Sequence, residues 1–88
     1  MNPANKKKLR AEAHTLKPVV MIGQSGLTAA VLAEIELALN SHELIKVKIR
    51  AERDERKLIS EKIRTDTGAE LIQTIGQIAV IYRLNPDK

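Results

Sequence analysis

The residues whose types and spacing suggest chemistry form a short glycine loop, Gly23-Gln24-Ser25-Gly26. The loop lies between an apolar run and a helical pattern. Backbone N–H groups at the start of a helix favour anions. Glycines at both ends allow a sugar-phosphate backbone to approach without meeting a Cβ. The pattern therefore predicts a phosphate-binding loop, although a plain strand-to-helix turn has the same composition.

Phosphate binding needs cations near the loop, and the chain carries two basic blocks. Its formal net charge is +4 and its sequence pI is about 9.6. Residues 1–22 hold five Lys/Arg against one Glu, and residues 45–57 hold six against three acids, whereas residues 23–44 are acidic. Nucleic acid is a reasonable partner for such a chain, and a solvated basic face is the alternative. The candidate RNA-binding side chains, with Thr28 beside the loop, are Lys6, Lys7, Lys8, Arg10, Lys17, Lys46, Lys48, Arg50, Arg53, Arg56 and Lys57.

Three of these cations, Lys46, Lys48 and Arg50, alternate with apolar residues and should share one face of a strand. Such a row could follow phosphates, or it could protect a sheet edge from aggregation. The only aromatic residue is Tyr82, which we expect to be a partly buried strand residue. Because a base-stacking platform needs exposed aromatic rings, recognition should depend on backbone and shape. Structured RNA is therefore a better candidate for the ligand than a short single strand.

Catalysis is poorly supported by the sequence. Ser25 resembles the serine of a G-x-S-x-G nucleophile elbow, but Leu27 stands where that motif needs glycine. The loop also lacks the Gly-Lys-Ser/Thr of a nucleotide-binding P-loop. His14 and His42 are far apart in the sequence, and there is no cysteine, so we expect no metal site. No enzyme activity, cofactor or small-molecule substrate is expected.

The N-terminal half should form the elements on either side of the loop. A helix should begin at Asn2-Pro3 and end near His14, with Leu9, Ala13 and Leu16 on its apolar side. The run 19–22 is continuously apolar and predicts a strand buried on both faces. A second helix should follow from about Thr28, its N-cap, to Asn40. Its apolar stripe consists of Leu27, Val31, Ile35 and Leu39, and its solvated acids are Glu34, Glu36 and Glu43.

The C-terminal half predicts one strand, one helix and a hairpin. Residues 44–50 alternate as a half-buried strand. Asp54 can cap the next helix, which turns Leu58, Ile59 and Ile63 toward the core and stops at Gly68. Strands over 71–75 and 77–84 should pair around Gly76. The predicted fold is α/β (α+β sandwich-like), ordered αβαβαββ, with a four-stranded mixed sheet, helices on both of its faces and a single domain over residues 1–88.

Composition also bears on location. Absence of cysteine fits a reducing compartment, and no apolar run exceeds five residues, so no transmembrane helix is expected. The basic start lacks the apolar segment of a secretory signal. We expect a cytoplasmic protein without a membrane partner.

Three segments together resemble one family. Residues 16–28, 42–49 and 73–83 resemble the opening, the second strand and the closing hairpin of the CRM (chloroplast RNA splicing and ribosome maturation) domain. The similarity covers about residues 5–84 and is closest in type to stand-alone bacterial YhbY-like proteins. It implies a KH-like αβαβαββ fold similar to the C-terminal domain of a bacterial translation initiation factor. It also implies RNA binding without catalysis, with the family's GxxG loop at Gly23, Gln24, Ser25 and Gly26.

The resemblance further implies a role. Bacterial members are associated with precursors of the large ribosomal subunit, and plant members support group II intron splicing. Two departures matter, because the loop interior is Gln24-Ser25 where many relatives carry a basic residue, and the chain stops at Lys88 without an extended basic tail. We expect an RNA-binding protein that docks on precursor ribosomal RNA, or on pre-ribosomal particles, during large-subunit assembly. The alternatives are a protein-interaction module on a ribosomal protein or assembly factor, and a general RNA chaperone or splicing-type factor.

Overall fold

The computed structural model describes residues 2–85, which form three helices and four strands. Their order is αβαβαββ, as predicted from the sequence. The elements are α1 (Pro3–Ala13), β1 (Pro18–Ile22), α2 (Ala29–His42), β2 (Leu44–Ile49), α3 (Arg53–Thr67), β3 (Glu70–Ile75) and β4 (Ile78–Tyr82).

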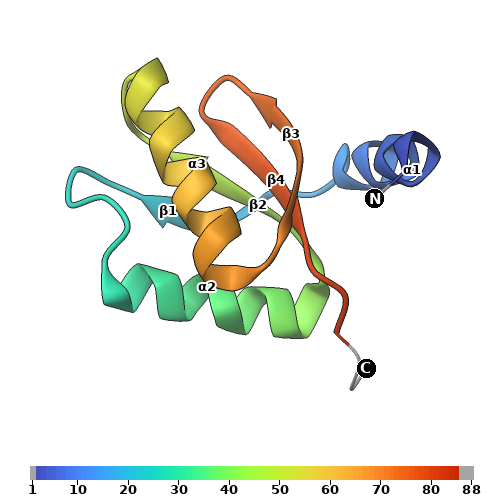
Figure 1. Cartoon of the computed structure of the whole chain (residues 1–88), viewed down its shortest axis with the longest axis horizontal. Coiled ribbons are helices and arrows are strands. Elements are labelled where there is room, and N and C mark those ends of the chain that lie inside the picture. Colours follow the sequence, from blue (N-terminus) through green and yellow to red (C-terminus); the bar gives the residue numbers. More distant parts are fainter. Residues whose placement is uncertain (1, 86–88) are drawn as a thin grey trace.

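All four strands belong to one mixed sheet with the order β1-β2-β4-β3 (Figure 1). Strands β1 and β2 are parallel because α2 carries the chain back across the sheet between them. Strand β4 is antiparallel to both of its neighbours, β2 and β3. The predicted four-stranded mixed sheet is therefore confirmed, with β1 and β3 at its edges.

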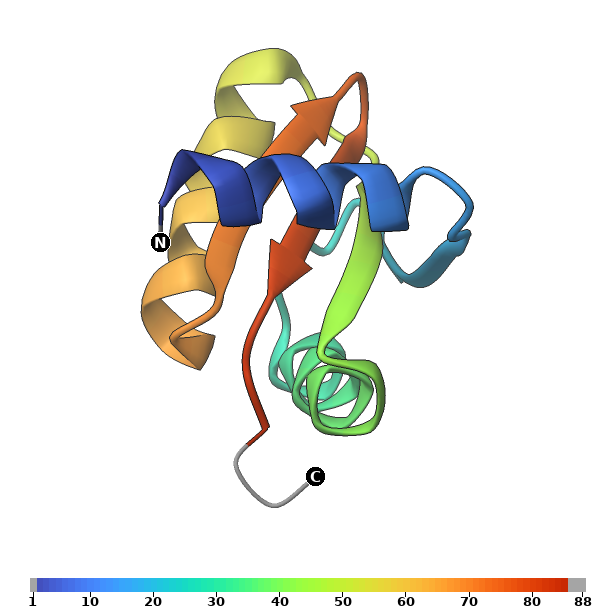
Figure 2. The same ribbon diagram turned by 90° about the vertical axis from the view of Figure 1, so that its right-hand side faces the viewer.

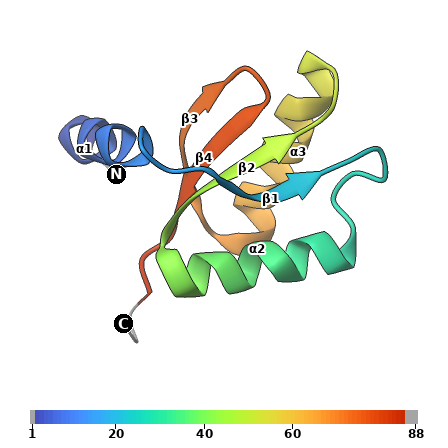
Figure 3. The ribbon, with the colours of Figure 1, turned by 180° about the vertical axis from the view of Figure 1, so that it is seen from behind.

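Helices α2 and α3 pack on one face of the sheet and enclose the larger part of the core (Figure 3). The stripe predicted for α2 is confirmed, since Ile35 and Leu39 are fully buried against the sheet. The alternation of β2 is also confirmed, because Val47 and Ile49 are buried with them while its lysines point to the other face. The period of two in β2 thus decides which side of the sheet becomes basic.

The opposite face is only partly covered, by α1. Figure 2 shows α1 lying across the strands, where Leu9 and Ala13 pack against Ile72, Val80 and Tyr82. Tyr82 is half-buried in this smaller cluster, as expected from the sequence. Helices therefore cover parts of both faces, as predicted.

Strand β1 differs from its prediction. Its run was expected to be buried on both faces, but Val19 is 52% and Met21 is 53% exposed, while Val20 and Ile22 are buried. The expectation was wrong because α1 packs over β2, β4 and β3 and leaves the outer face of the edge strand uncovered. An apolar run alone could not distinguish this edge strand from a central one.

Two details of α3 also differ. Leu58 is 71% exposed, because Ile59 and Ile63, one turn apart, already form the stripe that meets the core. Asp54 does not cap the helix: Glu52 occupies the N-cap position without a side-chain hydrogen bond, and Asp54 lies in the first turn. The predicted stop is confirmed, since Gly68 has a left-handed φ of 73°.

Arg83 joins the end of β4 to both helices of the larger core. Its guanidinium forms an ion pair with Glu36 of α2 at 2.9 Å. It also donates to the carbonyl of Thr67 at 2.8 Å and to Oδ1 of Asn40 at 2.9 Å. One planar group with several N–H donors thus holds three elements together.

We predict that Arg83→Met lowers the free energy of unfolding by about 1–3 kcal/mol, because the Thr67 carbonyl and Glu36 lose their partner. Urea denaturation monitored by circular dichroism would measure this. The matched control is Arg64→Met, which removes only an exposed pair with Glu61 and should cost less than about 1 kcal/mol. Equal losses for the two variants would contradict the role assigned to Arg83.

Candidate nucleic-acid interface

Three turns meet at one end of the sheet, which we call the loop end. They are the GxxG loop (23–26), the β2–α3 turn (50–52) and the β3–β4 turn (76–77). Two backbone hydrogen bonds join them: Arg50 N–H donates to the Ile22 carbonyl at 2.9 Å, and Ile49 N–H donates to the Gln77 carbonyl at 2.7 Å. The parallel pairing of β1 and β2 therefore brings the second basic block beside the glycine loop.

The GxxG loop is a compact turn leading into α2. The N–H of Gly26 donates to the carbonyl of Gly23 at 3.1 Å, and the N–H of Thr28 donates to the carbonyl of Gly26 at 3.1 Å. Gly26 has a φ of 72°, which favours glycine. The local fold therefore explains the second glycine of the motif.

The local backbone conformation does not explain the glycine at position 23. Its φ is not in the left-handed region, and a Cβ built on it would meet nothing within 4 Å. The residue and the loop interior, Gln24-Ser25, are exposed. A side chain at 23 would thus be tolerated by the fold but would occupy the space through which a ligand could approach the backbone.

The start of α2 presents N–H groups beside this loop. Thr28 caps the helix, as predicted, because its hydroxyl accepts from the N–H of Val31 at 3.2 Å. The exposed first-turn residues Ala29 and Ala30 donate to no other group among residues 2–85. Their N–H groups carry the partial positive charge of the helix terminus and favour an anion.

The cations of the loop end are mostly unpaired. Within residues 2–85, the side chains of Lys48, Arg50, Arg53 and Lys57 form no hydrogen bond or ion pair. Arg56 differs, since it is half-buried and its Nη1 donates to the Ala51 carbonyl at 2.7 Å. Arg56 therefore holds the β2–α3 turn, and the other cations remain available to phosphates.

The remaining predicted cations lie elsewhere. Figure 1 places α1 and the GxxG loop at opposite ends of the longest axis, along which the Cα atoms extend 33 Å. The candidates Lys6, Lys7, Lys8 and Arg10 on α1 are thus separated from the loop. Lys17 precedes β1, and the neighbouring Lys46 donates to the Leu16 carbonyl at 3.0 Å. The structure therefore divides the predicted residues into two basic regions.

Two of the three acids that were expected to form a solvated face instead form contacts within the folded chain. Glu36 pairs with Arg83. Glu43, which has a φ of 64°, accepts from the N–H of Asn85 at 2.7 Å. Sequence periodicity could not show these contacts, because both partners lie more than 40 residues further along the chain.

The structure also provides residues that the sequence did not single out. Thr74 and Gln77 belong to the β3–β4 hairpin and lie beside the first turns of α3. Their only sequence signal is their position next to Gly76. Among residues 2–85, no helix is long and apolar enough to cross a membrane, and no group of three His, Asp or Glu is arranged to hold a metal ion.

The similarity to known proteins is extensive. A family model, the CRS1/YhbY (CRM) domain, matches residues 1–83. The chain belongs to the CRM domain family. This CRM domain is 52% identical over 84 residues to an RNA-binding protein of Haemophilus influenzae, covering 94% of this chain and 85% of that protein. It is 48% identical over 82 residues to a probable RNA-binding protein of Pseudomonas aeruginosa, covering 92% and 79%.

A solved structure agrees with the fold. The solution structure of a hypothetical Staphylococcus aureus protein, described as a candidate RNA-binding protein, matches this CRM domain with a TM-score of 0.84 and 34% sequence identity. The match covers 96% of this chain and 88% of the other. The family resemblance and the fold predicted from the sequence are therefore both confirmed.

The two glycines of the CRM loop should respond differently to alanine. Gly26→Ala places a Cβ on a left-handed backbone and should lower the free energy of unfolding by about 1 kcal/mol or more. Gly23→Ala meets open space at an ordinary φ and should change it by less than about 0.5 kcal/mol. Urea denaturation of both variants would measure the difference. A loss at position 23 as large as at position 26 would show that the fold itself requires Gly23.

Proposed function

We propose that this chain is a single RNA-binding domain, residues 1–88, that docks on structured RNA through the loop end. The observation that carries the proposal is the glycine at position 23, which the fold does not require, next to cations whose side chains have no partner within residues 2–85. A phosphate at the loop would be bound by the exposed N–H groups at the start of α2. The absence of a side chain at Gly23 would allow the sugar-phosphate backbone to reach them.

The neighbouring turn compensates for the uncharged interior of the loop. Gln24-Ser25 supplies no cation, but the backbone bond from Arg50 to Ile22 places Arg50 directly beside the loop. Arg53 follows at the start of α3, and Lys48 pairs in register with Met21 of β1. Arginine suits this position because its planar guanidinium can bind two phosphate oxygens.

The shape of the basic surface favours a folded RNA. The α1 cations and the loop end lie at opposite ends of a 33 Å axis, so an RNA that contacts both must be extended and stiff, as a helical stem is. The sheet offers no exposed aromatic platform, because the only aromatic ring, Tyr82, is packed beneath α1. Contacts to phosphates and to RNA shape would therefore dominate.

The target proposed is the RNA of the large ribosomal subunit or its precursor, in the cytoplasm. The family membership supports it, together with the relatives that are named RNA-binding proteins. Binding would stabilise one conformation of the precursor RNA during assembly, without a chemical step. The alternative, in which the acidic face of α2 binds a protein partner, is weakened, because Glu36 and Glu43 are bound within the chain.

Phosphate contacts should make the affinity depend on salt. If about four to six phosphates are contacted, a log–log plot of the association constant against salt should have a slope of about −3 to −5. Gly23→Asp should weaken binding of a labelled RNA hairpin by at least about tenfold, because a carboxylate would occupy the phosphate approach. Its thermal unfolding should remain cooperative.

Thr65→Asp is the matched control for this charge change, because Thr65 is exposed near the end of α3, away from the loop end. Its affinity should stay within about twofold of the unmodified chain. A flat salt dependence, or equal affinity of Gly23→Asp and the unmodified chain, would refute phosphate binding at the loop.

The RNA target can be identified by ultraviolet crosslinking of the tagged protein in cells, followed by sequencing of the attached RNA. Crosslinks concentrated in one region of large-subunit ribosomal RNA or its precursor are expected. Crosslinks spread over introns or messenger RNA would support a general chaperone or splicing-type role instead. Protein partners that survive nuclease treatment, without RNA crosslinks, would favour the protein-interaction module.

A further inference from the structure

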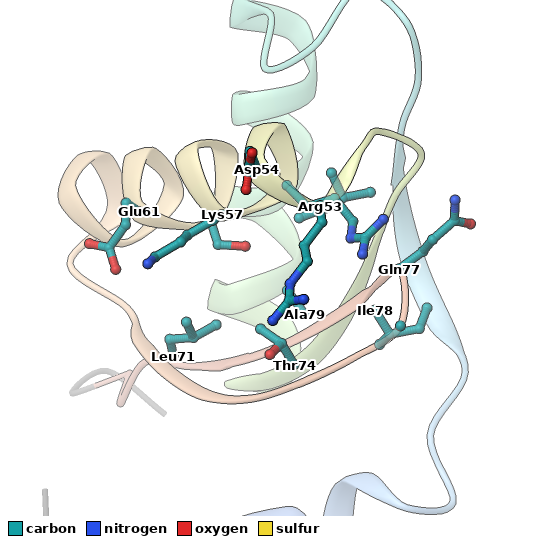
Figure 4. A pocket seen from close by; sticks show the side chains of 13 residues that line it. Arg53, Asp54, Lys57, Glu61, Leu71, Thr74, Gln77, Ile78 and Ala79 are labelled. Atoms are coloured by element: carbon teal, nitrogen blue, oxygen red, sulfur yellow. The ribbon is translucent and has the colours of Figure 1, made fainter.

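A cleft of about 670 Å³ lies between the first half of α3 and the β3–β4 hairpin (Figure 4). It opens beside the loop end, because the hairpin turn at Gly76 and Gln77 is bonded to the last residue of β2. A concave site of this size is within the range of small-ligand pockets, about 300–1,000 Å³.

The two sides of the cleft differ in chemistry. Arg53 and Lys57 line the helix side, and Figure 4 shows Arg53 extending across the cleft toward the hairpin. Thr74 and Gln77 line the hairpin side with a hydroxyl and an amide. Leu71 adds an apolar surface. The cleft thus combines cations, neutral hydrogen-bonding groups and an apolar surface.

Acidic side chains do not cancel these cations. Glu61 lies at one margin of the cleft, where Nε and Nη2 of Arg64 both donate to its carboxylate, at 3.2 and 2.8 Å. This hydrogen bond and the charge of Glu61 raise the pKa of Arg64 above its ordinary value. Asp54 also lines the cleft, but Arg53 and Lys57 form no ion pair with it or with Glu61. An anionic ligand would meet two cations that form no ion pair within residues 2–85.

We propose that this cleft receives one unpaired nucleotide of the RNA bound at the loop end. The phosphate lies against Arg53 and Lys57. The base edge meets Thr74, and its face lies on Leu71. The inference rests on the proposed function, because it extends the same RNA from the GxxG loop to a neighbouring cleft. It adds a preference: a stem with an unpaired nucleotide binds more tightly than a continuous stem.

The test compares two RNA hairpins that are identical except for a single-nucleotide bulge, with affinities measured by fluorescence anisotropy. The unmodified chain should bind the bulged hairpin about tenfold more tightly. Thr74→Tyr places a ring in the cleft without changing the charge and should abolish this preference while binding of the continuous stem is retained. The control is Ile75→Tyr, at an exposed neighbouring position that does not line the cleft, which should keep the preference.

A second variant, Gln77→Glu, keeps the test decisive if Thr74→Tyr fails to fold. Gln77 is an exposed turn residue that lines the margin of the cleft, and a carboxylate there should repel the phosphate of the unpaired nucleotide and so also remove the preference for the bulge. Equal affinity of the unmodified chain for both hairpins, or an unchanged preference in a folded Thr74→Tyr or Gln77→Glu, would overturn the cleft while leaving RNA binding at the loop intact. Failure of the unmodified chain to bind either hairpin would refute the proposed function itself.

Discussion

The arrangement of this molecule depends on the parallel pairing of β1 with β2. Because α2 returns the chain to the same side before β2 begins, both strands end at the same edge, and the Arg50 N–H reaches the Ile22 carbonyl. Strand β4 then pairs with β2 and brings Gln77 to the same place. A glycine loop, a basic turn and a hairpin turn that are distant in sequence are therefore joined by main-chain hydrogen bonds, which do not depend on particular side chains.

The side chains that stabilise the fold and the proposed RNA contacts lie in different parts of the molecule. Where β4 leaves the sheet, Arg83 unites α2, α3 and β4, and Glu43 holds the backbone of Asn85. The charged groups there are paired within the chain. At the loop end most cations form no ion pair within residues 2–85, and unpaired surface charges of one sign repel each other and add little to stability. This repulsion between unpaired cations is consistent with a surface whose counter-charges belong to a ligand.

The regular parts of the fold could be predicted because they follow local rules. The alternation of β2, the cap at Thr28 and the stop at Gly68 each depend on neighbours within a few residues. The errors arose where tertiary context decides. The exposure of Met21 depends on where α1 packs, and the exposure of Leu58 depends on which turn of α3 meets the sheet. The basic residues of the candidate site could be named from the sequence, but their division into two regions required the topology.

The two glycines of the loop show how structure refines a motif. From the sequence, both positions had the same two explanations, a turn or an approaching ligand. The left-handed φ of Gly26 means that the turn alone accounts for it, so its presence says nothing about RNA. Gly23 has an ordinary φ and open space above it, so conformational need does not account for it. A role of the motif in binding therefore depends on its first glycine, together with the neighbouring cations that the parallel strands place beside it.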